Sequence, residues 1–140
     1  MYLLDTDTFS RLTSYAGGNP SLVRRTRLAD AEHLFISVIT VEEVLRGRLD
    51  TIRKLERTPR APEAYAGFLL AYQVLQKFNV LPYDAAAETF FQALPAKIKQ
   101  KGTHDCRIAA VAAVNDLIVI TANTAHFSAI PGISHEDWTR

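Results

Sequence analysis

Cysteine is almost absent from this chain of 140 residues, which contains only Cys106. A single cysteine forms no internal disulfide and leaves no set of thiolates for a zinc site. No apolar run approaches the roughly 18 residues that a membrane-spanning helix requires, and the N-terminus reaches Asp5 before any run of signal-peptide length. We therefore expect a cytoplasmic protein without a disulfide framework or a membrane segment.

An excess of charge of one sign is also lacking, because 16 Lys and Arg residues stand against 15 Asp and Glu residues, a formal net charge of +1. The overall charge therefore neither favours nor excludes a nucleic acid partner, for which the positions of the charges matter. Hydrophobic residues make up 48% of the chain, which is typical of a globular domain. We find no repeat or linker, and the strongest loop signal, residues 17–20, is short. We expect one domain over residues 1–140.

Short apolar runs alternate with helical patterns along the chain. Strands are predicted at residues 2–4, 34–39, 80–82 and 117–120. Helices are predicted to begin near Thr8, after Thr40 as N-cap, over residues 68–78, from Asp84 to a break at Pro95, and from Asp105. Strands that alternate with helices predict an α/β fold with a mostly parallel sheet.

Oxygen-bearing side chains follow the predicted strands at the edge where ligands bind in parallel sheets. They are Asp5 and Asp7 after the first strand, Ser37, Glu42 and Glu43 after the second, and Thr121 and Asn123 after the last. Asp105, at the predicted start of the helix that comes before the last strand, is able to reach the same edge. Carboxylates gathered without Lys or Arg repel one another, so a hard divalent cation, Mg²⁺ or Mn²⁺, is the natural occupant.

The same acids also fit helix caps. Asp5 or Asp7 suits the N-cap of the first helix, and Asp105 suits that of a later one. Thr40 with Glu43 matches a capping box. Caps and ligand sites are compatible, because helix N-termini gather at this edge of the sheet. Capping alone does not require all the acids to converge, so their conjunction favours a site.

The helix after the second strand carries further candidates. Its periodicity directs Glu43 away from the core stripe, but does not decide firmly between Glu42 and Glu43. Gly47 lies one turn beyond Glu43 at a cost of about 1 kcal/mol in helix propensity, which suggests either a close approach to the backbone or a harmless glycine. Arg46 and Arg48 beside it are RNA-binding candidates, although ordinary solvated arginines would look the same.

Four segments and Phe127, in this order and spacing, resemble the PIN-domain ribonuclease family and, within it, the VapC-type toxins of type II toxin–antitoxin pairs. The segments are YLLDTD (2–7), ISVITVEEVLRG (36–47), DCRIAA (105–110) and ITANT (120–124). The resemblance covers essentially the whole chain. It implies a PIN-like three-layer α/β/α sandwich with a mostly parallel central sheet.

The resemblance also implies the site. Asp5, Glu43 and Asp105 are its metal-binding acids, and with Asn123 they form the catalytic group. Asn123 replaces the family's fourth acid and removes a charge, which leaves open whether one or two metals bind. Asp7 stands where asparagine is more usual and returns some negative charge. The secondary candidates are Thr6, Asp7 and Thr121.

The activity implied is metal-dependent hydrolysis of RNA phosphodiester bonds, with Mg²⁺ or Mn²⁺ activating a water. The implied partners are the RNA substrate, a second copy of the chain in a homodimer, and a cognate VapB-like antitoxin whose C-terminal segment lies across the acidic groove. We expect His104 and His126, near the site in sequence, to be peripheral.

Two alternatives remain. A non-catalytic RNA- or partner-binding module would keep the fold and explain Asn123. A haloacid-dehalogenase-like phosphatase would use Asp5 as nucleophile and Asp7 as acid/base, although Phe9 stands where that pattern has Thr or Val.

Overall fold

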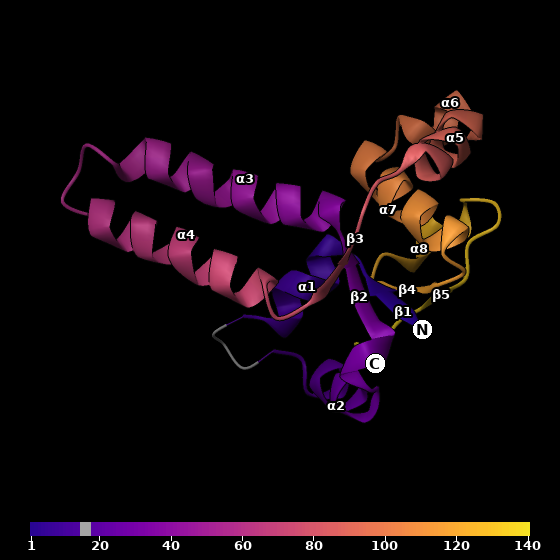
Figure 1. Cartoon of the computed structure of the whole chain (residues 1–140), viewed down its shortest axis with the longest axis horizontal. Helices are drawn as coiled ribbons and strands as arrows, with labels where there is room; N and C mark the ends of the chain where they lie inside the picture. Colours follow the sequence, from indigo (N-terminus) through magenta and orange to yellow (C-terminus); the bar gives the residue numbers. More distant parts are fainter. Residues whose placement is uncertain (15–17) are drawn as a thin grey trace.

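The computed structural model of the chain describes residues 1–14 and 18–140. Within these residues, five strands form one sheet in the order β3-β2-β1-β4-β5, and every neighbouring pair is parallel. Helices cover both faces of the sheet (Figure 1). The predicted three-layer α/β/α arrangement is confirmed, and the sheet is entirely rather than mostly parallel. Gly17, in the predicted loop, lies outside the described residues.

Helices and strands alternate along the described chain. Their bounds are β1 (Tyr2–Leu4), α1 (Thr6–Leu12), α2 (Pro20–Leu28), the short 3-10 helix η1 (Ala31–His33), β2 (Leu34–Ser37), α3 (Val38–Leu55), α4 (Ala61–Leu75), β3 (Asn79–Leu81), α5 (Ala85–Ala93), α6 (Ala96–Lys99), α7 (Thr103–Val114), β4 (Ile118–Ile120), α8 (Thr124–Ser128) and β5 (His135–Glu136). The break at Pro95 is confirmed, because α5 ends before it and α6 begins after it.

The second strand ends, and the helix after it begins, earlier in the sequence than predicted. β2 ends at Ser37, whose Oγ accepts a hydrogen bond from the backbone N–H of Thr40 at 3.3 Å and so caps α3. The predicted strand to residue 39, the N-cap at Thr40 and its capping box with Glu43 are therefore wrong. One well-placed hydroxyl starts the helix at Val38 despite the β-branched residues there, because it satisfies a backbone donor that otherwise lacks a partner.

Two acids differ in their relation to the helix beside them. Asp5 is the N-cap of α1, and its Oδ1 accepts from the backbone N–H of Thr8 at 2.8 Å. Asp105 is not an N-cap, because α7 begins at Thr103 and places Asp105 in the first turn. An acid in a first turn interacts favourably with the helix dipole and leaves its side chain available.

The two faces of the sheet bury separate clusters, because successive side chains of a strand point to opposite faces. Leu3 and Val119 pack with α5 and α7 on one face, and Leu4, Ile36 and Ile120 pack with α1, α2 and the end of α4 on the other. The strands are short apolar runs because both of their faces are covered.

The sequence did not predict the helix α2 or the edge strand β5. The chain enters α2 through Gly18, with φ of +67°, and Asn19, which caps the helix. The Asn19 side chain also donates to the backbone carbonyl of Thr139 at 2.9 Å. Beside it, the Trp138 ring packs edge-on against Tyr2 with centroids 4.7 Å apart. The C-terminal segment thus closes the face of the core that α2 covers.

Helices α3 and α4 run antiparallel and project beyond the sheet (Figure 1). Ala64 and Ala71 of α4 are buried, whereas Tyr65, Leu69 and Tyr72 on the same helix are about half exposed. Among the described residues, no helix is both long enough and apolar enough to cross a membrane.

Candidate active site

Asp5 lies at the carboxyl end of the central strand β1, and only 3% of its surface is exposed. Burial raises the pKa of Asp5 above its ordinary value, and the nearby charge of Asp105 raises it further. Hydrogen bonds from Thr121 and Thr8 act in the opposite direction. Asp5 is therefore a desolvated carboxyl group that faces a second carboxylate.

Glu43 reaches this edge from the second turn of α3. Thr6, the residue after Asp5, donates its hydroxyl to Glu43 Oε1 at 2.8 Å, and its oxygen lies 3.0 Å from that of Thr40. The other carboxylate oxygen, Oε2, lies 3.3 Å from Nδ1 of His104 on α7. Glu43 is thus directed across the edge of the sheet, whereas its neighbour Glu42 is exposed and pairs with an arginine.

Asp105 approaches from the first turn of α7. Its Oδ2 lies 2.9 Å from Nδ1 of His126 and 3.5 Å from Nδ2 of Asn123. The backbone N–H of Asn123 in turn donates to the Thr121 hydroxyl at 2.9 Å. The segment after β4 therefore orients Asp105 while its Thr121 faces Asp5.

The structure brings the three predicted acids to one edge of the sheet. Asp105 lies near enough to contribute to the raised pKa of Asp5, and Glu43 contacts Thr6 and His104, the residues adjacent in sequence to each of them. Within the described part of the chain, no Lys or Arg forms an ion pair with any of the three. Their negative charge is therefore not balanced by a lysine or an arginine, and the basic side chains beside them are His104 and His126.

The donor chemistry of this group suits a hard divalent cation. Carboxylate, amide and hydroxyl oxygens are the ligands that Mg²⁺ and Mn²⁺ prefer, and a cation would relieve the repulsion between Asp5 and Asp105. Across residues 1–14 and 18–140, no three His, Cys, Asp or Glu side chains already stand at the spacing of a metal site. Glu43 and Asp105 hold His104 and His126 instead. The residues fit the cation in chemistry, and Glu43 and Asp105 would exchange their contacts with the histidines for contacts with the ion.

Other sequence candidates lie apart from this group. Asp7 is on the exposed side of α1 and forms an ion pair with Arg11 at 2.8 Å. Arg46 is exposed and pairs with Glu42 one turn away. The phosphatase reading needs Asp7 beside Asp5 as an acid/base, and this ion pair gives Asp7 a different partner.

The sequence led us to expect that His104 and His126 are peripheral. The structure instead places both against the candidate acids. His126 is largely buried, with 11% of its side chain exposed, and His104 is about one-third exposed. Each contacts a candidate acid through Nδ1. A histidine beside an acid in sequence is a weak signal, because only the packing of α7 and α8 on the sheet brings the rings to the carboxylates.

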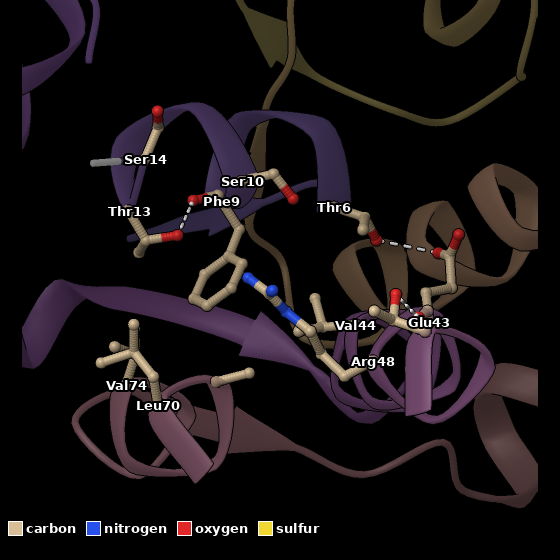
Figure 2. A pocket seen from close by; sticks show the side chains of 13 residues that line it. Thr6, Phe9, Ser10, Thr13, Ser14, Glu43, Val44, Arg48, Leu70 and Val74 are labelled. Carbon is tan, nitrogen blue, oxygen red and sulfur yellow. Dashed lines mark hydrogen bonds between the residues drawn. The ribbon is translucent and has the colours of Figure 1, made fainter. Parts of the chain in front are cut away.

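A cavity of about 590 Å³ opens beside the site, between α1, α3 and α4 (Figure 2). Thr6 and Glu43 lie at one end, and Phe9, Val44 and Leu70 are among the apolar residues of the wall. A Cβ atom added at Gly47 would have no neighbour within 4 Å among the described residues beyond its own helix. Gly47 itself lines the cavity, so the free space beside its Cα is part of the cavity.

Comparison with known proteins agrees with this architecture. The family model of the PIN domain matches residues 2–133. A tRNA(fMet)-specific endonuclease VapC from Salmonella typhimurium is 28% identical over 141 aligned residues, which cover 98% of this chain and 97% of the relative.

Solved structures show the same fold. DNA-bound VapBC from Salmonella typhimurium superposes with a TM-score of 0.70 at 27% identity, and covers 98% of this chain and 97% of its own. FitAcB from Neisseria gonorrhoeae has a TM-score of 0.74 at 24% identity, with coverage of 98% and 97%. Because the family model spans nearly the whole sequence, this chain belongs to the PIN domain family.

Proposed function

We propose that this protein is a metal-dependent endoribonuclease and the toxin of a VapBC-type toxin–antitoxin pair. The observation that carries the proposal is the convergence of Asp5, Glu43 and Asp105, without a Lys or Arg partner among the described residues, at the carboxyl edge of the sheet. The name of the Salmonella typhimurium relative supports the nuclease activity, and the VapBC structure supports the toxin role.

Each side chain has a role in this proposal. Asp5, Glu43 and Asp105 hold Mg²⁺ or Mn²⁺, which when bound supplies an activated water and neutralises charge on the departing oxygen. Thr6 orients Glu43 through its hydrogen bond, and Asn123 contacts Asp105 as the fourth member of the group. No side chain is required as a nucleophile.

The proposal extends to substrate and partners. The substrate is RNA, and initiator tRNA is the first to test because the Salmonella typhimurium relative is named for it. The protein partners are a VapB-like antitoxin and a second copy of the chain. Both need apolar surface to dock on, and the exposed Tyr65, Leu69 and Tyr72 of α4 supply some.

Substitution of Asp5 tests the activity without removing the helix cap. Asp5→Asn keeps a side-chain oxygen at the N-cap of α1 and removes the carboxylate, so we expect loss of most RNA cleavage with a nearly unchanged Tm. Asp5→Ala, the matched variant, also loses the cap and is expected to be less stable by about 1 kcal/mol. Cleavage of total RNA and initiator tRNA in Mg²⁺ or Mn²⁺, with an EDTA control, is the measurement.

Three results would contradict the proposal in different ways. Cleavage retained by Asp5→Asn or in EDTA would remove the metal-binding role of the acids. RNA binding without cleavage by the folded wild-type protein would favour the non-catalytic module. Hydrolysis of a small phosphate monoester without action on RNA would favour the phosphatase.

A further inference from the structure

We infer that the cavity between α1, α3 and α4 binds the nucleotide next to the scissile phosphate of the RNA, with Arg48 contacting its phosphate. The inference rests on the proposed function and names a binding site for the substrate outside the group of acids. The volume of the cavity, about 590 Å³, is within the usual range of small-molecule sites.

The cavity joins directly to the candidate active site. Thr6 and Glu43, which are hydrogen-bonded to each other, form part of its wall. Arg48 lies five positions after Glu43 on α3, which is about 7.5 Å along the helix axis. Both residues line the cavity, so the nucleotide next to a bond cut beside Glu43 would lie within reach of the cavity and of Arg48.

The wall matches a nucleotide in chemistry. Val44, Leu70 and Val74 form an apolar surface on which a base can pack (Figure 2). Ser10 and Thr51, which carry hydroxyls, line the same cavity. Hydroxyl groups are suited to contact ribose or phosphate oxygens.

Arg48 supplies the positive charge that an anionic occupant needs. Its guanidinium points into the space between the helices in Figure 2, and a Cβ added at Gly67 would lie 3.0 Å from its Nη1. Among the described residues, Arg48 forms no ion pair, whereas Arg46 and Arg53 on the same helix pair with acids. An arginine without a carboxylate partner is available to a phosphate.

The first test measures RNA binding in the Asp5→Asn protein, which is used as the parent so that the RNA stays intact. Fluorescence anisotropy of a labelled single-stranded RNA is recorded over a range of salt concentrations. Adding Arg48→Gln is expected to weaken binding about tenfold and to reduce the slope of log affinity against log salt by about 0.7.

The matched control is Arg53→Gln. Arg53 is on the same helix, exposed and paired with Asp50 at 3.5 Å, and it does not line the cavity. Its removal changes the net charge equally, so we expect binding within about twofold of the parent.

The second test fills the cavity. Gly47→Leu adds a side chain to a space in which no described residue beyond its own helix lies within 4 Å of the Cβ, and leucine favours a helix more than glycine does. We expect RNA affinity to fall about tenfold or more, since the occupant and the leucine compete for one volume, while the Tm does not decrease.

The outcomes separate this inference from the proposed function. Weaker binding in both Arg48→Gln and Gly47→Leu supports the cavity as the nucleotide site. Parent-like affinity in either variant overturns it and leaves the cavity to a protein partner, even where wild type cleaves RNA and Asp5→Asn does not. Absence of cleavage by the wild type contradicts the proposed function through a separate measurement.

Discussion

At the scale of single residues, the His126 ring is held closely beside Asp105. The ring is largely buried, Nδ1 lies 2.9 Å from Asp105, and Nε2 has no hydrogen-bond partner among the described residues. A Cβ added at Gly102 would come within 2.6 Å of the ring, so the backbone there packs directly on the histidine. This packing leaves the ring little freedom and holds Asp105 in one orientation.

We therefore predict that His126 positions Asp105. His126→Ala is expected to reduce kcat about tenfold or more and to raise the Mg²⁺ concentration for half-maximal cleavage. The reason is that the Asp105 carboxylate binds a metal less well when no partner holds it in one orientation. His126→Asn places an amide donor near the position of Nδ1 and should recover part of the loss.

His33→Ala is the control, because His33 is exposed and precedes β2, at the opposite edge of the sheet. It should leave both quantities unchanged. An unaltered Mg²⁺ dependence in His126→Ala would contradict the positioning role.

At the scale of elements, the hairpin of α3 and α4 contains one glycine in each helix. Gly47 is exposed to the cavity, and a Cβ there meets no atom of the described residues beyond its own helix within 4 Å. A Cβ at Gly67 would meet Arg48 Nη1 at 3.0 Å, so the arginine must move to admit it. Glycine lowers the stability of either helix, but only at Gly47 is it replaceable without a change in packing.

The two glycines lead to unequal predictions. Gly47→Ala is expected to raise the free energy of unfolding by about 0.5–1 kcal/mol, because alanine loses less backbone entropy and adds no clash. Gly67→Ala should gain less, since part of the benefit is lost in displacing Arg48. Chemical denaturation followed by circular dichroism measures both, and an equal or larger gain for Gly67→Ala would show that Arg48 does not pack there.

At the scale of the whole molecule, the C-terminal segment closes one of the two core clusters. Trp138 is 4% exposed, packs against Tyr2, and donates its Nε1–H to Glu136 Oε2 at 2.7 Å. The Asn19 side chain, at the start of α2, binds the backbone of the next residue, Thr139. This hydrogen bond connects the end of the sequence to a helix more than a hundred residues earlier.

Removal of the indole should therefore affect the whole fold. We predict that Trp138→Ala lowers the free energy of unfolding by about 3–5 kcal/mol, the usual cost of a large-to-small change in a core. Trp138→Phe keeps most of the packing and loses the bond to Glu136, so its cost should be smaller. Guanidinium denaturation measures both, and a loss below about 1 kcal/mol for Trp138→Ala would show that the segment contributes little to the core.

The sequence by itself determined the fold class. Runs such as residues 2–4 and 117–120 are apolar because both faces of the sheet are covered, and this property is local in the chain. It also indicated that acids follow the strands, since parallel strands bring their carboxyl ends to one edge. The start of α3 was not determined, because the capping by Ser37 competes with the strand propensity of the next residues.

The tertiary structure alone decided how the candidate acids are held. Thr6 and Glu43 are 37 residues apart, and Asp105 and His126 are 21 apart, so no periodicity in the sequence relates them. The cavity beside Glu43 and the exposed face of α4 likewise depend on how α3 and α4 pack, which periodicity does not specify. Local hydrophobic pattern selects the elements, whereas hydrogen bonds between distant segments form only after those elements have packed.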